Sequence, residues 1–376
     1  MKEISLYVHI PFCKQRCFYC DFPTFAGKEQ YREEYVNALI KEIDEKCSDY
    51  VIKTIFIGGG TPSHLETEEL KKLLKAINKL KFKDNIEYSM ECNPGTLSKE
   101  KLLVMKENGV NRISFGLQSC NDKLLNQIGR IHTFSEFLEN YNLAREIGFN
   151  NINVDLMYGL PNLTIELWKD TLNQICKLKP EHISAYSLII EEGTAFYKMY
   201  ENNKLNLPAE DEERIMDKLT KNILKENGYH QYEISNYALN GMECEHNKVY
   251  WSLEDYIGVG CASSSYINGI RKVNESSISK YIKKIKQNEN VVVEEHINSI
   301  EDEIEEFIFM GLRMLKGIDL VKFKKKFGAN IGSIYSKAIE KNIKDGLLIL
   351  NNNNMFLTTK GIEVSNYVMS DFILDK

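Results

Sequence analysis

Strand-like and helix-like segments alternate along the first half of the chain, and this order limits the choice of fold more than any other feature. The strand candidates are residues 4–10, 51–57, 86–91, 110–117, 152–157 and 182–188. Segments with helical periodicity lie between them, at residues 29–47, 66–80, 99–108, 134–147 and 166–178. Alternation of this kind implies parallel strands joined by right-handed crossovers. About six repeats fit an α/β fold with a partial (β/α)6 barrel better than a closed eight-fold barrel.

The pattern changes after about residue 203. Residues 210–227 have helical periodicity, residues 229–234 are strand-like, and residues 244–266 are dense in aromatic residues and glycines. From about residue 304 the order is helix, short helix, helix, two short strands and a final helix, which resembles a winged-helix unit. We therefore expect a barrel core at 1–235, a linking segment at 236–300 and a C-terminal winged-helix-like α+β domain at 301–376.

The composition is that of a soluble globular protein, with 43% hydrophobic and 27% charged residues. No run approaches the ~18 apolar residues of a membrane span. Residues 1–12 lack the features of a signal peptide, so we expect a cytoplasmic protein without an integral membrane segment. The net charge of -6 gives no general attraction to nucleic acid. The lysines at 322 and 324–326 are interpreted as a solvated helix face because an acidic segment lies at 301–306.

Polar and glycine-rich clusters follow the predicted strands. They are the cysteine loop at 13–20, residues 58–62, 91–94 and 116–118, Asp155 and Ala185. Chemistry in a parallel barrel gathers at the carboxyl ends of its strands. Because the clusters recur at successive strand ends, we expect them to form one site.

Three of the nine cysteines, Cys13, Cys17 and Cys20, share one short loop with the spacing C-x3-C-x2-C. An odd cysteine count in a reducing compartment argues against a disulfide framework. A structural zinc site or an ordinary electron-transfer cluster needs four protein ligands. Three thiolates can instead hold three corners of a [4Fe–4S] cubane and leave the fourth iron open. The alternative is zinc bound by the three cysteines with His9 or a distant ligand.

The glycine run at 58–60, followed by Thr61 and Pro62, comes directly after the second strand. Glycines allow backbone to approach a ligand closely and to adopt positive φ. The exposed N–H and C=O groups of such a turn could bind a polar ligand beside the cysteine loop. A glycine run alone could also be a simple strand-to-helix turn.

At these motifs the sequence resembles the radical S-adenosylmethionine (SAM) superfamily. More narrowly, it is similar to the branch that contains oxygen-independent coproporphyrinogen III oxidase and the heme chaperones of the HemW type. The matching stretches are YVHIPFC at 7–13, GGGTP at 58–62, ECNP at 91–94, FGLQS at 115–119, DLMYGLP at 155–161 and YIGVG at 256–260. The resemblance implies a [4Fe–4S] cluster whose open iron binds the amino acid end of SAM.

The resemblance also implies which residues contact SAM. Tyr7 would lie beside SAM, and the backbone around Tyr19 would contact the adenine. The methionyl end would meet Gly59, Gly60 and Thr61. The rest of the wall would be Glu91 at a ribose hydroxyl, Gln118, Asp155, Arg130 paired with the SAM carboxylate, and Ala185 on the adenine side.

Two features separate the oxidase from the chaperone. The oxidase pattern has a fourth cysteine two residues after the third, where this chain has Phe22, and the first cysteine comes too early for the oxidase's amino-terminal arm. Residues 246–251 (HNKVYW) match the H-N-x-x-Y-W pattern of the chaperone branch. The resemblance implies that His246 helps to bind heme iron, with Tyr250 and Trp251 packed on the porphyrin. Cys244 is either a second ligand or a buried thiol.

The sequence thus favours a heme-binding protein that delivers heme to apo-proteins such as those of the respiratory chain. An electron donor such as flavodoxin or ferredoxin would serve the cluster, reductive cleavage of SAM is left open, and membrane association would come only through a partner. The rival is oxidative decarboxylation of coproporphyrinogen III to protoporphyrinogen IX. A radical SAM enzyme that modifies nucleic acid through the winged-helix tail ranks last.

Overall fold

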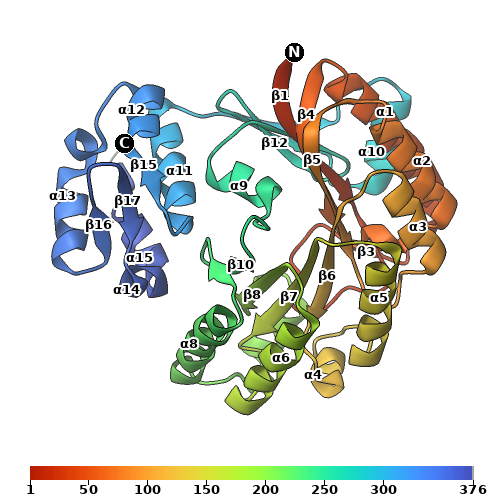
Figure 1. The fold of residues 1–376 in the computed structure, drawn as a ribbon. Coiled ribbons are helices and arrows are strands. Elements are labelled where there is room, and N and C mark those ends of the chain that lie inside the picture. The colour runs from red at the N-terminus through yellow and green to blue at the C-terminus, as the bar shows by residue number, and fades with distance from the viewer. Residues whose placement is uncertain (375–376) are drawn as a thin grey trace.

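The computed structural model describes residues 1–374, and its centre is a 12-stranded sheet that does not close into a barrel (Figure 1). Six parallel strands follow one another in sequence order across the middle of the sheet. They are β1 (Lys2–Ile10), β4 (Tyr50–Gly59), β5 (Lys81–Cys92), β6 (Arg112–Gln118), β7 (Ile152–Tyr158) and β8 (His182–Ser187). The predicted partial (β/α)6 barrel is therefore confirmed.

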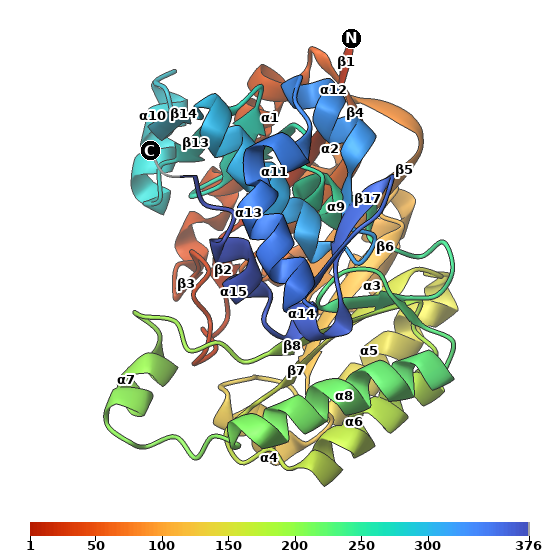
Figure 2. The ribbon, with the colours of Figure 1, turned by 90° about the vertical axis from the view of Figure 1, so that its left-hand side faces the viewer.

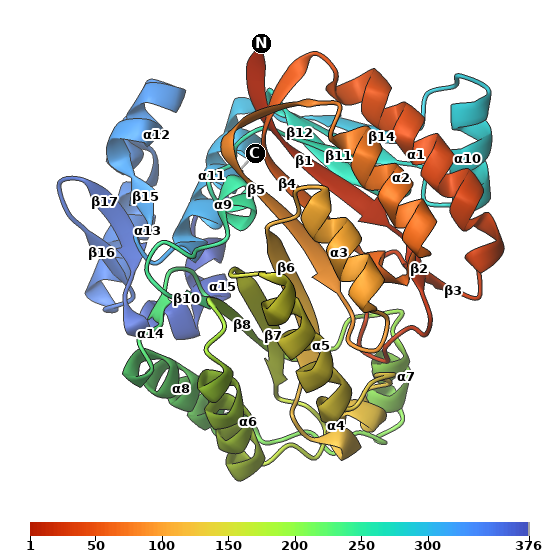
Figure 3. The same ribbon diagram turned by 45° about the vertical axis from the view of Figure 1, so that its right-hand side comes forward.

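Helices connect the successive strands and cover the outer side of the sheet (Figure 3). They are α1 (Arg32–Cys47), α2 (Thr67–Ile77), α3 (Lys99–Glu107), α5 (Phe134–Ile147) and α6 (Ile165–Leu178), with a short additional α4 (Asp122–Gln127) before α5. Helix α5 illustrates how the sequence sets its ends. Thr133 and Glu136 form a capping box at its start, and Gly148 ends it in the left-handed conformation at φ 96°.

Two groups of short strands extend the sheet at its edges. On one side β11 (Tyr256–Val259) runs parallel to β1, and β12 (Ser264–Ile267), β13 (Ile270–Asn274) and β14 (Val292–Ile297) continue as an antiparallel ladder. On the other side β10 (Asn236–Ala238) and β9 (His230–Gln231) pair beyond β8. The strand predicted at 229–234 is thus only two residues long. Helix α10 (Ile278–Lys286), between β13 and β14, packs against α1.

The connections after β8 contribute three further helices. Helix α7 (Ala195–Glu201) lies in the long loop that follows β8, and α8 (Glu210–Glu226) packs against α6 (Figure 2). The indole Nε1 of Trp168 on α6 donates to Thr220 Oγ1 on α8 at 3.0 Å. Helix α9 (Glu245–Trp251) lies between the strands and the C-terminal domain (Figure 1). Near the amino terminus, β2 (Phe12–Cys13) and β3 (Phe25–Ala26) pair with each other.

The C-terminal domain has the predicted winged-helix-like order (Figure 2). Its elements are α11 (Ile300–Arg313), β15 (Ile318–Asp319), α12 (Leu320–Phe327), α13 (Ile331–Lys344), β16 (Leu348–Leu350), β17 (Asn354–Leu357), α14 (Thr359–Glu363) and α15 (Ser365–Ser370). The single final helix that we expected is two helices, because Val364 leaves the helical conformation at φ -124°. The domain has its own core around Ile308, Phe323 and Met355.

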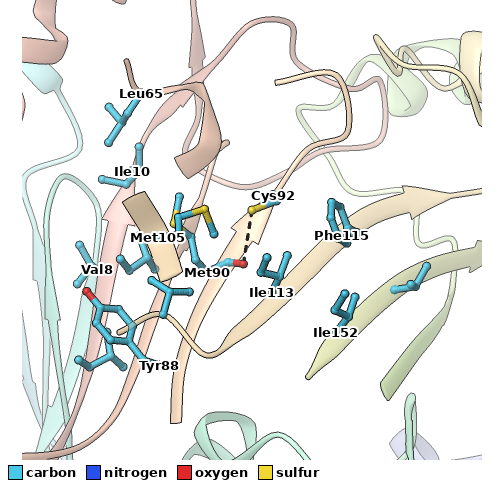
Figure 4. Close-up of a cluster of buried hydrophobic side chains, with 14 of the residues drawn as sticks. Val8, Ile10, Leu65, Tyr88, Met90, Cys92, Met105, Ile113, Phe115 and Ile152 are labelled. Atoms are coloured by element: carbon cyan, nitrogen blue, oxygen red, sulfur yellow. Dashed lines mark hydrogen bonds between the residues drawn. The ribbon is translucent and has the colours of Figure 1, made fainter. Parts of the chain in front are cut away.

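The main core lies between the parallel strands and the helices outside them. Figure 4 shows Val8 on β1, Met90 on β5, and Ile113 and Phe115 on β6, all buried on this side of the sheet. Since side chains alternate along a strand, the intervening residues face the barrel interior. Strand β6 is an example: Ile113 and Phe115 face the core, whereas Arg112 and Ser114 line the interior cavity described below.

The division of the chain at residues 235 and 300 stays a prediction, because strands β11 to β14, within the expected linking segment, continue the sheet of the barrel. Within residues 1–374, none of the helices combines the length and the apolar character needed to cross a membrane.

Candidate cofactor-binding site

A cavity of about 670 Å³ lies at the carboxyl ends of the parallel strands, a size typical of small-molecule sites. Twelve of the fourteen predicted site residues line it: Tyr7, Cys13, Cys17, Tyr19, Cys20, Gly59, Gly60, Thr61, Glu91, Gln118, Arg130 and Asp155. Ala185 and His246 are not among the described residues that line the cavity. Ala185 lies on β8 between Ser184 and Tyr186, which do line it, so its side chain points to the other face of the sheet.

All three cysteines of the loop open into this cavity. The backbone N–H of Cys20 donates to the carbonyl of Cys17 at 3.2 Å, and Arg16 Nε donates to the carbonyl of Cys20 at 3.1 Å. Cys13 follows β1 on the short strand β2, and its Sγ lies 3.5 Å from Thr61 Oγ1. Burial raises the pKa of the Cys13 and Cys20 thiols.

The donor set fits a three-cysteine cluster. Across residues 1–374, no three His, Cys, Asp or Glu side chains are arranged to hold a single metal ion. In a [4Fe–4S] cluster each cysteine binds a different iron, so its ligands need not converge on one point. What such a cluster requires is three thiols facing one open space, and the loop provides that.

His9, the alternative zinc ligand, is held by other groups. Its Nδ1 shares a hydrogen bond with the Tyr7 hydroxyl at 3.0 Å, and its Nε2 lies 3.0 Å from the carbonyl of Pro23. The ring is buried, and His9 is not among the described residues that line the cavity. It therefore does not face the three thiols in this structure.

The glycine run holds its backbone against the cysteine loop. Gly60 N–H donates to the carbonyl of Ile10 at 2.8 Å, and Thr61 N–H donates to the carbonyl of Phe12 at 2.8 Å. Gly59 adopts φ 112°, and a Cβ there would lie 2.5 Å from the His9 ring. A Cβ on Gly60 would lie 2.8 Å from the Phe12 carbonyl. No side chain fits at either position, so backbone alone forms this wall of the cavity.

Two half-buried carboxyl groups, Glu91 on β5 and Asp155 on β7, face the cavity. Burial, reinforced by the charge of Asp155, raises the pKa of Glu91 to about 8, although Gly59 N–H donates to its Oε2 at 3.0 Å. Burial also raises the pKa of Asp155, whose carboxyl accepts hydrogen bonds from Asn153 at 2.7 Å and Ser114 at 3.2 Å. Such groups are suited to bind hydroxyl donors and a nearby positive charge.

Arg130 links the strand ends to the cysteine loop. Its Nη1 lies 3.4 Å from Cys17 Sγ, and its Nη2 donates to Asn93 Oδ1 at 2.8 Å and to the carbonyl of Gly116. Gln118 lies at an irregularity in β6, with φ 75°, a conformation that is uncommon for a residue other than glycine. Arg130 is therefore a half-buried cation next to the thiols, where a carboxylate bound at an open iron would need a counter-charge.

His246 on α9 is buried within the barrel and not in contact with the cavity. Its Nδ1 lies 2.9 Å from Thr54 Oγ1, its Nε2 lies 2.9 Å from the Tyr250 hydroxyl, and its ring stacks on Phe56 at 5.3 Å. Burial, with smaller effects of Lys53 and Arg112, lowers the pKa of His246 to about 3. The imidazole is neutral at pH 7, and both of its nitrogens already have hydrogen-bond partners.

The other residues of the H-N-x-x-Y-W motif reach different surroundings. Asn247 and Tyr250 line the cavity. Trp251 instead packs at the junction with the C-terminal domain, with the guanidinium of Arg313 4.4 Å from its ring. Tyr250 and Trp251 therefore do not form one platform for a porphyrin in this structure.

Glu87 on β5 caps the start of α9. Its carboxylate accepts from the N–H groups of Glu245 at 2.9 Å and His246 at 3.0 Å. Cys244 is buried, and its Sγ lies 3.5 Å from Glu87 Oε1.

Several residues of the cavity wall were not predicted from the sequence. They include Arg112, Ser114, Asn153, Met157, Ser184 and Asn247. A period of two along β6, counted back from Gly116, would have identified Ser114 and Arg112. At the rim, Phe22 is 61% exposed and Ile189 is 68% exposed, so large apolar side chains border the opening.

Comparison with known proteins agrees with this geometry. The family described as the radical SAM superfamily matches residues 7–175, and the HemN C-terminal domain matches residues 298–364. The chain is 40% identical to the heme chaperone HemW of Bacillus subtilis over 98% of this chain and 99% of that protein. It is 38% identical to the heme chaperone HemW of Lactococcus lactis over 100% of this chain and 98% of that protein.

Among solved structures, the chain resembles the coproporphyrinogen III oxidase HemN from Escherichia coli. The TM-score is 0.86 at 22% identity, covering 99% of this chain and 90% of that one. This likeness establishes the shared fold, including the C-terminal domain.

Proposed function

Because this chain belongs to the HemW family of heme chaperones within the radical SAM superfamily, we propose that it binds heme and transfers it to apo-proteins, with a [4Fe–4S] cluster and SAM in the cavity. The observation that carries the proposal is the cavity itself. It joins the three thiols, the glycine wall and the carboxyl groups of Glu91 and Asp155 with two residues of the chaperone motif, Asn247 and Tyr250.

Each group in the cavity would have a defined task. Cys13, Cys17 and Cys20 would bind three irons, and the backbone at Gly59 to Thr61 would bind the methionyl end of SAM. Arg130 would orient the SAM carboxylate, while the carboxyl groups of Glu91 and Asp155 would accept hydrogen bonds from SAM and lie near its positive charge. When bound, the cluster would supply a single electron for reductive chemistry on SAM.

At the heme end, we propose His246 as an axial ligand. Its neutral imidazole has the protonation state that iron needs. To reach iron, the ring must give up one of its two hydrogen bonds, and the bond to Tyr250 leads toward the cavity that Tyr250 lines. Heme binding at His246 therefore requires a movement of α9 or of the Tyr250 side chain.

The proposal also covers the partner proteins and the cellular compartment. The recipients would be apo-proteins such as respiratory-chain cytochromes, and the electron donor would be a flavodoxin or a ferredoxin. The protein would act in the cytoplasm and would meet a membrane only through a partner.

The test is anaerobic reconstitution with iron and sulfide, followed by titration with heme, with and without SAM. We expect one heme per chain, no conversion of added coproporphyrinogen III, and transfer of heme from the loaded protein to an apo-cytochrome, followed by absorbance. Formation of protoporphyrinogen IX would instead identify the protein as a coproporphyrinogen III oxidase. Failure to bind heme would refute the proposal.

The ligand assignment needs its own variants. His246→Ala, and His246→Asn as a smaller change, should alter the heme spectrum and weaken binding, whereas His296→Ala, at an exposed histidine, should not. Circular dichroism would confirm that each variant is folded. An unchanged heme spectrum and affinity in folded His246→Asn would exclude His246 as the ligand.

A further inference from the structure

The inner wall of the cavity on β6, β7 and β8 carries several polar side chains. Inward-facing positions of parallel barrels usually carry branched apolar side chains that fill the interior. Here Arg112, Ser114, Asn153 and Ser184, on three neighbouring strands, line the cavity instead. This wall can therefore bind a polar group of a ligand that reaches past the strand ends.

Arg112 is the cation of this inner region. Its side chain is 2% exposed, and it lines the cavity from β6. Its Nε has no hydrogen-bond partner anywhere in residues 1–374. A guanidinium is always charged and presents its N–H groups as a planar fork, so burial without a partner is costly.

The nearby carboxylates have other hydrogen-bond donors. Glu87 accepts from the backbone N–H groups at the start of α9, and Asp155 accepts from Asn153 and Ser114. Burial opposes the charge of Arg112, but neighbouring groups, led by Cys244 and Glu87, outweigh it and raise the pKa of Arg112. The guanidinium thus stays charged while its fork is available to a ligand in the cavity.

We propose that Arg112 is an anion-binding residue of the cavity and that its ligand is a propionate of the bound porphyrin, held as a bidentate pair. The inference rests on the proposed function, because it takes heme as the occupant. Heme is a largely apolar disc whose charged peripheral groups are its two propionates, and a carboxylate matches the guanidinium fork.

The carboxylate of SAM is a poorer candidate. It belongs near the cysteine loop, where Arg130 contacts Cys17 and the carbonyl of Gly116. Arg112 lies four residues before Gly116 on β6, about 13 Å along the strand. One small carboxylate cannot serve both positions.

The experiment compares heme with heme dimethyl ester, in which both propionates are neutral, on the reconstituted protein. We expect the ester to bind the unsubstituted protein about 10- to 100-fold more weakly than heme, as loss of a charged hydrogen-bonded pair implies. Arg112→Met should bind heme more weakly by a similar factor, and its affinities for heme and for the ester should be equal. The heme affinity of Arg112→Lys should lie between those of Arg112→Met and the unsubstituted protein. Arg214→Met, at an exposed arginine, should bind heme and ester as the unsubstituted protein does.

The outcomes separate this inference from the proposed function. Equal binding of heme and ester to the unsubstituted protein would overturn the role of the propionate without need of any variant. If Arg112→Met still binds heme more tightly than the ester, or if the substitution weakens the binding of both equally, the role of Arg112 is overturned while heme binding stands. If the unsubstituted protein binds neither, the proposed function fails and this inference fails with it.

Discussion

The strand-end loops and helix α9 (Glu245–Trp251) hold their motif residues in opposite ways. The loops are fixed by backbone hydrogen bonds, such as Gly60 N–H to Ile10 and Thr61 N–H to Phe12, which leave thiols and carboxyls facing the cavity. In α9 the side chains themselves hold the helix in place. His246 is hydrogen-bonded to Thr54, and Trp251 packs against Arg313. The loops are arranged to receive a ligand as they stand, whereas α9 must exchange partners before His246 can bind one.

The largest effect should follow from removing a thiol of the loop. Cys17→Ala should bring iron in the reconstituted protein from about four per chain to near zero and should abolish SAM binding, because two thiolates cannot anchor the cluster. Iron analysis and absorption spectra measure this. Cys120→Ala, at a cysteine outside the loop, is the control and should keep its iron. A full cluster in Cys17→Ala would mean that the loop does not supply its ligands.

On the α9 side, His246→Ala should destabilise the fold by about 3 kcal/mol. The substitution leaves a cavity beside Phe56 and removes partners from Thr54 and Tyr250. Denaturant unfolding measures the loss, and His296→Ala should change stability by less than about 0.5 kcal/mol. Equal stabilities of the two variants would mean that His246 does not hold α9.

The depressed pKa of His246 also predicts acid sensitivity. In the unfolded chain the imidazole takes up a proton near pH 6.5, but in the fold it does so only near pH 3. Between these values the unfolded state binds more protons, so stability falls as the pH falls, by about 1.4 kcal/mol per pH unit at most. His132, whose pKa is also lowered to about 3 by burial, adds a similar slope.

Unfolding at pH 7.0 and pH 5.5 tests this. His246→Asn should lose less stability over that interval than the unsubstituted protein, by about 1 kcal/mol. A variant with the same loss would contradict a buried, neutral His246.

On the cavity side, SAM affinity should rise about fivefold between pH 7 and pH 8. The reason is that the raised pKa of Glu91, about 8, leaves most of its carboxyl protonated at pH 7. Bound SAM, with its hydroxyl donors and positive charge, should favour the ionised form. Glu91→Gln should bind SAM with an affinity that is flat across this range. A pH dependence that persists in the variant would assign it to another group.

The smallest effect should come from the contact of α9 with the C-terminal domain. Arg313→Met removes the guanidinium from the face of Trp251 and from the buried carboxyl of Glu233, 3.8 Å away, and should cost about 1 kcal/mol of stability. The cavity lies elsewhere, so SAM binding should not change. Weakened SAM binding in this variant would show that α9 couples the cavity to the C-terminal domain.

The strand-end site was largely predictable from the sequence because each motif follows its own strand. Because the strands are parallel, their carboxyl ends all meet at one edge of the sheet. The placement of Cys13, Gly59 and Glu91 at this edge could therefore be predicted without knowing which distant segments pair. The position of Arg112 on the inner face was also predictable, since β6 alternates polar or small residues with Ile113, Phe115 and Leu117. The raised pKa of Glu91 depends on burial and on Asp155, which no local pattern reveals.

The surroundings of α9 could not be predicted in this way. His246 meets Thr54 almost two hundred residues earlier in the chain, and Trp251 meets Arg313 in another domain. The ladder β11 to β14 was missed for a similar reason. Strand β11 is only four residues long and pairs with β1 from the other end of the barrel sequence, and β14 is mostly exposed, so neither gives a strong local strand pattern. A motif in the sequence thus identified the residues of α9 but not the direction in which each side chain points.

Electron paramagnetic resonance of the reduced, reconstituted protein tests the central claim most directly. Three cysteines and an open iron predict a [4Fe–4S] signal that changes when SAM is added and that does not change with SAM in Arg130→Met or Glu91→Ala. A signal indifferent to SAM in the unsubstituted protein would mean that the fourth iron is not available, and would contradict the site described here.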